Sequence, residues 1–581
     1  MTQQNTTDST VLSKVERIKR ESQGLMGELA AELHDPNRSH LSDEAIQVLK
    51  FHGSYQQDDR DERKVRQHNK RERAWQFMIR TRTAGGRLTA EQYLALDELA
   101  STYANDTLRI TTRQGIQFHG VEKSSLKPLI RALNEHIVTT QAACGDVARN
   151  VMTCPVADLL PGDGTAFDYQ ALAAQVSDRL LPESTAYYEL WLDGEKILAD
   201  GTHIKIQQQR DESLYGPTYL PRKHKIGIGL PHDNCIDVYT HDLALEAVLE
   251  DGQLRGFNLL VGGGLGYTHN KPETFARLSD RAGFLPPEQA LAVLETATTI
   301  YRDFGDRTNR RHARMKYIVA DRGIAWFREE LARRLGAPLA DPVAVTQHDV
   351  CDHLGWQQQA DGNWLVGIWI ENGRVKDAVD QPTRSGIREI VQTVRPEVRL
   401  TAHHNIILTH IAPADKPRVE ALIAQYGLVI DSAPISNLRR YAMACPALPT
   451  CGLAVAESER YLPALIGELE ARGLGNEQIW IRMSGCPNSC SRPTTAEVGL
   501  VGRSMGLYQV YLGGSFAGTR LARLYRGEVR EHDLADLLES LIVRWRTERL
   551  PNEAFGDWSD RVLGGAGELQ AWGAPSSYIE A

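Results

Sequence analysis

The chain has 581 residues, too many for one hydrophobic core, so its length predicts two to four domains. Its formal net charge is −9 with both signs scattered along the chain, which argues against nucleic acid as a partner. No stretch reaches the roughly eighteen apolar residues of a membrane span, and the N-terminus MTQQNTTDST lacks the pattern of a secretory leader. We therefore expect a cytoplasmic protein that neither spans a membrane nor binds nucleic acid.

The residue pattern of the chain changes near residue 76, from polar and charged segments to predicted strands and helices. Residues 1–75 read as a polar tail followed by helix and linker, and the run from Asp58 to Arg73 mixes charges as a solvated face does. From Phe77, the stretch FMIRTRTAGGRLTAEQYLALDELASTYA predicts a strand, a turn and an amphipathic helix. The next stretch, LRITTRQGIQFHG, alternates as a strand does.

An internal repeat relates the two halves of the chain. Leu108 to Gly120, LRITTRQGIQFHG, aligns without gaps with Val398 to His410, VRLTAHHNIILTH. A second match joins NVMTCPV, at Asn150, to YAMACPA, at Tyr441, and the runs FNLLVGGGLG and QVYLGGSFAG close the two blocks. Two matches in the same order indicate a duplicated gene.

Four of the eight cysteines form two tight pairs in the second copy: Cys445 with Cys451, and Cys486 with Cys490. Such pairs beside Pro, Gly or Ser can turn four thiolates toward one iron–sulfur cluster. Zinc prefers C-x2-C spacing, which neither pair has, and buried cysteines without a metal are the third reading. The first copy has Cys154 in the place of Cys445 but nothing that resembles the other three. One copy holds the metal site, and the other is free for another use.

Several cations adjoin apolar or strand-like stretches, where a bare charge is costly: Arg80, Arg149, Lys223 and Lys225. The two lysines are two residues apart, so on a strand they point to one face. Solvated surface charge is the alternative for any one of them. An anionic ligand would relieve the cost of burying them.

Over about Leu49 to the C-terminus the chain resembles the haemoprotein subunits of assimilatory sulfite reductases, in the sirohaem-dependent sulfite and nitrite reductase family. The matching stretches include RITTRQGIQFHG, NVMTCP, TYLPRKHKIGIGLP, ACPALPTCGLAVAESERYLP and SGCPNSCSRPTTAEVGLVG. The two-part cysteine motif is specific, whereas QFHG or the glycine run alone is weak.

The resemblance implies an α+β fold with duplicated ferredoxin-like half-domains and two sirohaem- and cluster-binding domains related by pseudo-two-fold symmetry. The expected divisions are a tail and linker (1–75), half-domain 1 (76–140), a sirohaem and substrate domain (141–345), half-domain 2 (346–435) and a cluster and sirohaem domain (436–581).

The resemblance also implies cofactors and site residues. A 4Fe-4S cluster is expected on the four paired cysteines, with the thiolate of Cys490 bridging it to the iron of a sirohaem. The implied substrate-binding cations at the open axial position are Arg80, Arg149, Lys223 and Lys225. Arg113 is expected to hold sirohaem carboxylates. Asn488 offers amide donors to sulfur or haem, or serves only as a turn residue.

The implied activity is the six-electron reduction of sulfite to sulfide in assimilatory sulfur metabolism, with sirohaem-dependent reduction of nitrite to ammonia as the alternative. The loop Val261 to Gly266 does not fit the dinucleotide fingerprint G-x-G-x-x-G. Electrons are therefore expected from a separate protein, either an NADPH-oxidising flavoprotein or a ferredoxin. A non-catalytic electron carrier and a zinc-stabilised binding module are the other classes, and visible spectra separate them. Cys144, Cys235 and Cys351 stand alone in the sequence and are expected to be ordinary buried or semi-buried thiols.

Overall fold

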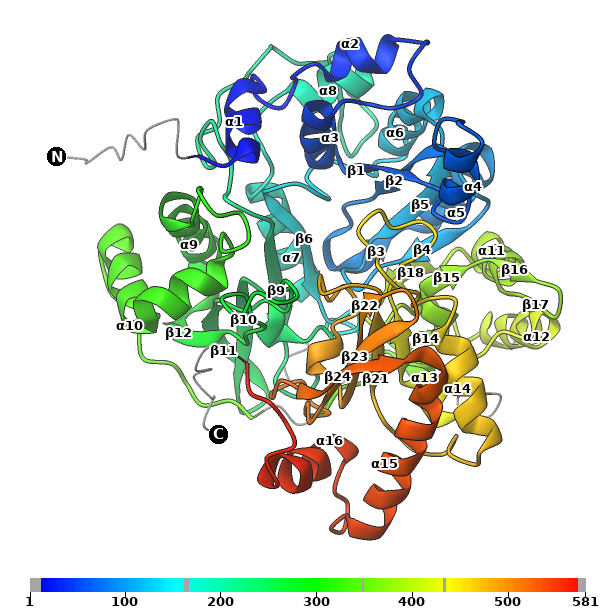
Figure 1. Cartoon of the computed structure of the whole chain (residues 1–581). Helices are drawn as coiled ribbons and strands as arrows, with labels where there is room; N and C mark the ends of the chain where they lie inside the picture. The colour runs from blue at the N-terminus through cyan, green and yellow to red at the C-terminus, as the bar shows by residue number, and fades with distance from the viewer. Residues whose placement is uncertain (1–11, 161–166, 347–348, 432–434, 573–581) are drawn as a thin grey trace.

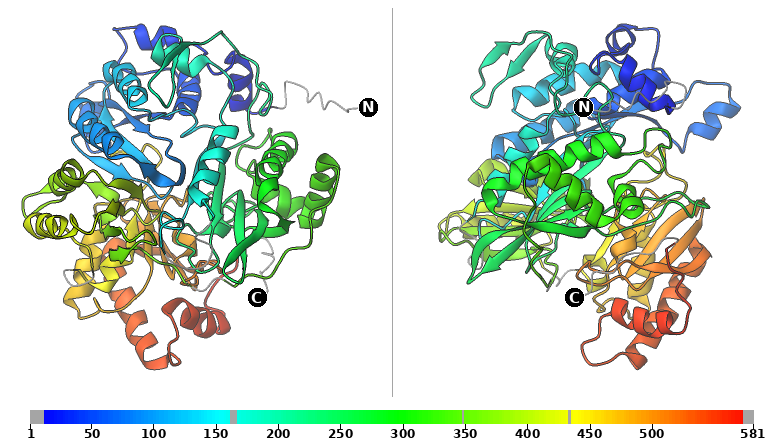
Figure 2. Two further views of the ribbon diagram at one scale, coloured as in Figure 1. Left: turned by 180° about the vertical axis from the view of Figure 1, so that it is seen from behind. Right: turned by 90° about the vertical axis from the view of Figure 1, so that its left-hand side faces the viewer.

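The computed structural model describes residues 12–160, 167–346, 349–431 and 435–572, which form four five-stranded sheets with helices around them (Figure 1). Helices α1 (Lys14–Glu21), α2 (Leu29–His34) and α3 (Asp43–Leu49) lie at one end of the molecule. Helices α15 (Leu534–Glu548) and α16 (Phe555–Trp558) lie at the opposite end, as the reverse view confirms (Figure 2). None of the described helices is both long and apolar enough to cross a lipid bilayer.

The first two sheets belong to the half-domains and exchange edge strands. The first has the order β1-β2-β5-β4-β15 and the second the order β13-β14-β19-β18-β3. Their strands are β1 (Ser54–Asp58), β2 (Trp75–Arg80), β3 (Arg87–Leu88), β4 (Leu108–Ile110), β5 (Ile116–Val121), β13 (Gly355–Gln358), β14 (Trp364–Ile368), β15 (Arg374–Val375), β18 (Glu397–Leu400) and β19 (Ile406–Ile411). Each half-domain lends one short strand to the other, because β3 pairs with β18 and β15 pairs with β4.

Strand β1 lies within the segment 1–75, which the sequence analysis expects to be tail and linker. It pairs along its whole length with β2 as the edge of the first sheet. The Asp58 carboxylate is buried and pairs with Arg63, on helix α4 (Arg63–His68). The segment therefore contributes to the half-domain sheet as well as to the helices before it, and residues 1–11 lie outside the described residues.

The other two sheets share one topology. Their orders are β12-β11-β10-β9-β6 and β20-β21-β22-β23-β24. Their strands are β6 (Ala148–Thr153), β9 (His224–Gly229), β10 (Leu243–Glu250), β11 (Gln253–Val261), β12 (Asp280–Leu285), β20 (Ala442–Ala444), β21 (Ile481–Ser484), β22 (Val498–Ser504), β23 (Leu507–Leu512) and β24 (Arg523–Arg530). Counted along the chain, the first two pairings in each sheet are parallel and the next two are antiparallel. The predicted duplication and α+β fold are confirmed.

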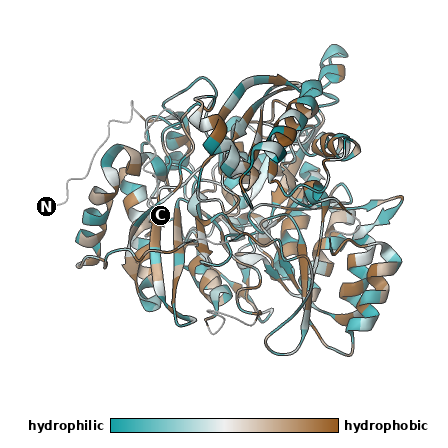
Figure 3. Cartoon of the chain, turned by 90° about the horizontal axis from the view of Figure 1, so that it is seen from below, coloured by the Kyte–Doolittle hydropathy of each residue, from teal (hydrophilic) through white to brown (hydrophobic). Residues whose placement is uncertain are grey.

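Helices cover these sheets. The remaining helices are α5 (Ala90–Tyr103), α6 (Leu126–Glu135), α7 (Tyr169–Arg179), α8 (Ala186–Leu192), α9 (Ala290–Phe304), α10 (Met315–Leu335), α11 (Thr383–Val394), α12 (Lys416–Tyr426), α13 (Asn437–Arg440) and α14 (Leu462–Ala471). Two short ribbons, β7 (Glu195–Ile197) with β8 (His203–Lys205) and β16 (Asp377–Ala378) with β17 (Gln381–Pro382), lie outside them. Figure 3 shows helices with apolar and polar faces, as expected where one face packs on a sheet.

Helix α5 begins where the sequence predicts a helix. Thr89 and Gln92 form a capping box, in which each side chain accepts from the other residue's backbone N–H. Tyr93 and Leu96 are buried on its inner face. Leu88 comes before the helix and lies in strand β3.

Candidate cofactor and substrate site

Two neighbouring parallel strands bring the paired cysteines together. Cys445 directly follows β20, while Cys486 and Cys490 lie in the loop after β21. The carboxyl ends of parallel strands meet at one edge of a sheet, so these two loops face each other. Cys451 joins them through a turn in which its N–H donates to the Ala447 carbonyl at 2.7 Å.

The four thiols are electrostatic neighbours; Cys445 and Cys486 are buried, Cys451 is half-buried and Cys490 is exposed. Burial raises the pKa of Cys445 to about 12, and the Cys490 and Cys486 sulfurs add to the rise. Burial likewise raises the pKa of Cys451 to about 11, with Cys490 and Cys445 next in importance. Metal coordination would keep such thiols in the thiolate form despite burial.

The donor set fits an iron–sulfur cluster better than a single ion. A single metal ion requires its ligand atoms to lie close together. Among the described residues these four sulfurs do not form such a compact group, whereas another set of side chains does. The Gly485 N–H points to Cys445 Sγ at 3.3 Å, and Asn488 Nδ2 donates to Cys486 Sγ at 3.4 Å. Such hydrogen bonds to sulfur are among the means by which proteins set cluster potentials.

Two of the predicted cations, Arg80 and Lys223, lie close enough to Cys490 to interact with it electrostatically, and Arg149 and Lys225 are electrostatic neighbours of Lys223. Arg80, at the end of β2, donates to Cys144 Sγ at 3.2 Å. Burial lowers the pKa of Arg80, but Cys144, Tyr55 and Cys490 nearby outweigh that effect, so its pKa is raised. Arg149, in β6, is 7% exposed and donates to the Gly145 carbonyl at 2.8 Å.

The two lysines are half-buried at the start of β9. In the part of the chain that the structure describes, no hydrogen bond or salt bridge is made by either ammonium group. Burial lowers the pKa of Lys223 to about 7, with Arg314 and Arg222 contributing, while the charge of Cys490 opposes the fall. Burial also lowers the pKa of Lys225 far below its usual value, followed by repulsion from Lys223. An anionic ligand here would restore both charges.

Arg113 is a further electrostatic neighbour of Lys225. Its Nη2 donates to the carbonyls of Asn150 and Ile226, while its buried Nε has no partner among the described residues. Burial lowers its pKa to about 9, and Arg149 adds to the effect. One donor of Arg113 is thus left for a ligand oxygen.

The sequence analysis missed two further cations, Arg314 and Lys316, at the start of helix α10. Arg314 makes a bidentate salt bridge to Asp242, with both contacts at 2.8 Å, and Asp242 also accepts the Lys225 backbone N–H. Lys316 Nζ donates to the Gly266 carbonyl at 2.7 Å. Arg314 and Lys316 are two residues apart, as Lys223 and Lys225 are. This shared spacing is the signal in the sequence that could have pointed to them.

The glycine loop 261–266 packs against the last cysteine loop. The Tyr267 N–H donates to the Pro487 carbonyl at 3.0 Å, and a Cβ on Gly266 would lie 3.4 Å from the Asn488 carbonyl. At Gly263 a Cβ would come within 2.3 Å of the Tyr239 carbonyl, so only glycine fits there. The loop therefore shapes the wall next to the cysteines.

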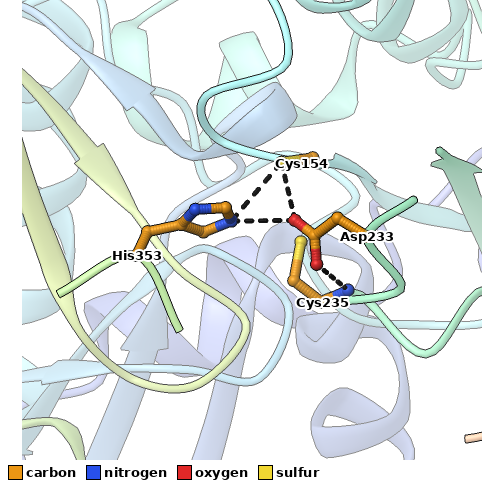
Figure 4. Close-up of side chains that lie close together, drawn as sticks. All are labelled: Cys154, Asp233, Cys235 and His353. Carbon is orange, nitrogen blue, oxygen red and sulfur yellow. Dashed lines mark hydrogen bonds and ion pairs between the residues drawn. The ribbon is translucent and has the colours of Figure 1, made fainter. Parts of the chain in front are cut away.

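The expectation of buried or semi-buried thiols is confirmed for Cys144 and Cys235, which also have close partners, and is wrong for Cys351. Cys144 accepts the hydrogen bond from Arg80 described above. Cys235 lies close to Cys154 inside a buried group (Figure 4). Sequence separation hid both contacts, whereas Cys351 is exposed.

Comparison with known proteins gives consistent matches. The family model described as "Nitrite and sulphite reductase 4Fe-4S domain" matches residues 172–339, and "Nitrite/Sulfite reductase ferredoxin-like half domain" matches 68–136 and 357–426. Proteins of Geobacillus kaustophilus (strain HTA426) and Myxococcus xanthus (strain DK1622), both named "Sulfite reductase [NADPH] hemoprotein beta-component", are 45% and 46% identical. The alignments cover 95% of this chain and 95% and 96% of those proteins. The solved structure of the Mycobacterium tuberculosis NirA protein matches with a TM-score of 0.76 at 25% identity, over 95% of this chain and 96% of that one.

Proposed function

We propose, because the chain belongs to the nitrite and sulphite reductase family, that it reduces sulfite to sulfide with a sirohaem and a 4Fe-4S cluster. The observation that carries the proposal is the position of two lysines without salt-bridge partners among the described residues. Lys223 lies near the thiol of Cys490, and Lys225 lies beside Lys223. A cluster site and an anion site thus adjoin.

The cysteines would hold the cofactors as the family resemblance implies. Cys445, Cys451, Cys486 and Cys490 would bind the cluster, and the Cys490 thiolate would also reach the sirohaem iron. When bound, these groups supply single electrons and a metal centre for the substrate. The free Nε of Arg113 is suited to a sirohaem carboxylate. The amide of Asn488 would tune the Cys486 sulfur.

The cations would bind sulfite and supply protons. Arg80 and Arg149 offer planar donors that can hold oxygen atoms in fixed positions. Lys223, with a pKa of about 7, can donate a proton near neutral pH, as a general acid must. Taking sulfur from the +4 to the −2 state releases three oxygens as water, so proton delivery matters at every stage.

The electron donor is proposed from the relatives. They are named as components of sulfite reductases that use NADPH, and in the part of this chain that the structure describes we find no dinucleotide-binding glycine fingerprint. We propose an NADPH-oxidising flavoprotein as the partner, with a ferredoxin as the alternative. The cytoplasmic location stays a prediction.

Nitrite is the second candidate substrate, since the matching family models name both anions. Four cations suit a dianion such as sulfite better than the single charge of nitrite. Initial rates with reduced methyl viologen, measured over a range of sulfite and nitrite concentrations, decide the preference. A higher kcat/KM for nitrite than for sulfite would overturn the assignment to sulfite.

A cysteine variant tests the cofactor assignment. We expect the purified protein to contain about five iron atoms per chain, four from the cluster and one from sirohaem. Cys490→Ser should lose sirohaem coupling and sulfide production, whereas the control Cys351→Ser, at an exposed thiol, should keep both. Near-normal sulfide production by Cys490→Ser would show that this thiolate does not bridge the two centres.

A further inference from the structure

A second group of potential metal ligands lies in the first copy, apart from the four paired cysteines (Figure 4). His353 Nε2 lies 2.9 Å from Asp233 Oδ2, and Cys154 Sγ lies 3.3 Å from the same oxygen. Cys154 Sγ and His353 Nε2 are 3.6 Å apart. With the sulfur of Cys235, the ligand atoms all lie within 4.8 Å of one another. All four side chains are buried, and none is more than 5% exposed.

We propose that Cys154, Asp233, Cys235 and His353 bind one zinc ion. Tetrahedral zinc with bonds of about 2.0–2.3 Å places its ligand atoms about 3.3–3.8 Å apart, close to the separations found here. Two thiolates, an imidazole and a carboxylate form a mixed set that suits zinc. Four protein ligands leave no open position, so the site would be structural.

The second oxygen of Asp233 is already held in place. Asp233 Oδ1 accepts the backbone N–H groups of Cys235 and Cys351, each at 3.0 Å. This leaves Oδ2 directed at Cys154 and His353. Hydrogen bonds of this kind, one shell outside the metal, orient carboxylate ligands.

The duplicated fold places this group at the position of the cluster in the other copy. Cys154 and Cys445 each directly follow the first strand of their sheet, β6 and β20. Cys235 and Cys490 each lie six residues beyond the end of the next parallel strand, β9 and β21. Two of the thiols therefore occupy equivalent places, and the first copy completes its set with other residue types.

Those other residues explain why a single ion is expected. In the loop after the second strand, Asp233 stands where the other copy has Asn488, four residues past the strand. His353 comes from the segment between α10 and β13, far along the chain. Their ligand atoms lie within 4.8 Å of the sulfurs of Cys154 and Cys235, a grouping that the paired cysteines of the second copy do not form among the described residues.

The surroundings can balance the charge of the site. Zinc with two thiolates, one carboxylate and a neutral imidazole carries a net charge of −1. Next to it, Arg482 and Arg492 both pair with Asp237, at 2.7 and 3.0 Å, which leaves one positive charge. Arg492 and Cys235 are close enough to interact electrostatically.

The ion would tie three segments of the chain together. It would join the loops after β6 and β9 to the segment that leads into the second half-domain. The loop after β9 also reaches the cluster domain, because Asn234 Nδ2 donates to the Ala517 carbonyl at 2.7 Å. Zinc would thus fix the junction between the two copies.

Metal analysis of the holoenzyme tests the site without reference to turnover. We expect about one zinc per chain in protein purified from cells grown with zinc. The zinc K-edge absorption fine structure should show two sulfur neighbours at about 2.3 Å and two nitrogen or oxygen neighbours at about 2.0–2.2 Å. Iron measured in the same sample reports on the other cofactors, so failure of one assignment is distinguishable from failure of the other.

Variants locate the ion. The double variant Cys154→Ser with Cys235→Ser, and separately His353→Ala, should lower the zinc content by at least about tenfold. The matched control Cys351→Ser removes a neighbouring thiol outside the group and should retain zinc. The proposal is overturned if the parent lacks zinc, if the double variant keeps it, or if peptide mass spectrometry finds a Cys154–Cys235 disulfide.

Discussion

No described carboxylate forms a salt bridge with the side chain of Lys223 or Lys225. Burial lowers the pKa of Lys223 to about 7 and the pKa of Lys225 far below its usual value, and repulsion from Lys223 adds to the fall at Lys225. Two neighbouring ammonium groups in a buried setting favour binding of an anion, which raises both pKa values again.

Removing either ammonium group should impair turnover and spare the cofactors. In Lys223→Met and Lys225→Met we expect sulfite turnover to fall about a hundredfold or more, because a proton donor and a transition-state contact are lost. Steady-state rates with reduced methyl viologen and the visible spectrum measure the two properties. Lys271→Met, at an exposed lysine, is the control. Parent-like rates in both variants with sirohaem bound would place the substrate elsewhere.

Glu497 is a buried carboxyl group just before β22. Its Oε2 accepts the Trp480 N–H at 2.9 Å and its Oε1 accepts the Gly556 N–H at 2.8 Å. Burial nevertheless raises its pKa to about 7, with a small contribution from Asp557. The folded protein therefore binds this proton more tightly than the unfolded chain, whose Glu pKa is about 4.3.

The sign of the resulting pH dependence follows directly. The stability that Glu497 contributes is fully present below about pH 4.3 and is lost as the pH rises through about 7. Between pH 5 and 8 we expect Glu497→Gln to gain up to about 3 kcal/mol of unfolding free energy relative to the parent. Urea titrations across this range measure the difference. The control Glu528→Gln, exposed in β24, should give a constant difference, and a similarly flat result for Glu497→Gln would refute the raised pKa.

At the scale of elements, the half-domains are interlocked by exchanged strands and paired helices. Helices α5 and α11 pack against each other. Between them Arg384 Nε lies 2.6 Å from Asp97 Oδ1, with both side chains less than 5% exposed. A buried pair of this kind leaves an uncompensated charge when one partner is removed.

Two salt bridges connect helix α5 to the region of helix α11 and form a matched test. Asp97→Ala should lower the free energy of unfolding by about 3 kcal/mol, because the buried Arg384 keeps only the exposed Asp106 as a salt-bridge partner, and Arg388 loses its contact with Asp97 as well. Glu91 lies on α5, as Asp97 does, and forms an exposed pair with Arg395, which directly follows α11. Glu91→Ala should lower the free energy of unfolding by less than about 1 kcal/mol. Urea denaturation compares the two. Equal losses would mean that burial of the Asp97 pair is unimportant.

At the scale of the whole molecule, the cluster domain exposes apolar side chains beside one cysteine. Leu453 is 65% exposed and lies two residues after Cys451. Arg60 holds this turn by donating to the carbonyls of Cys451 and Ala454, each at 3.2 Å. An exposed apolar residue this near the cysteines is suited to contact with an electron-donor protein.

The donor contact can be separated from the chemistry. Leu453→Asp should slow sulfite reduction driven by NADPH and a flavoprotein by on the order of tenfold, since a charge replaces an apolar contact. Rates with methyl viologen, a small donor, should not change. Leu550→Asp, similarly exposed just after α15, is the control. A matching loss with both donors would indicate damage to the site instead.

The sequence by itself determined the features that depend on residues close together in the chain or on aligned stretches of it. The ungapped repeat fixed the duplication, because aligned strands such as β4 and β18 keep their register. The two cysteine pairs predicted a metal site, since the members of each pair are close together in the chain. The spacing of Lys223 and Lys225 placed both lysines on the same face of a strand.

Only the tertiary structure decided which distant segments meet. The exchange of β3 and β15 depends on two-residue strands too short to carry a pattern. The Arg314–Asp242 pair and the group of Cys154, Asp233, Cys235 and His353 join residues that are far apart in the chain; Cys154 and His353 are separated by 199 positions. Such contacts form because parallel strands align their loops at one sheet edge, a long-range pairing that no local periodicity encodes.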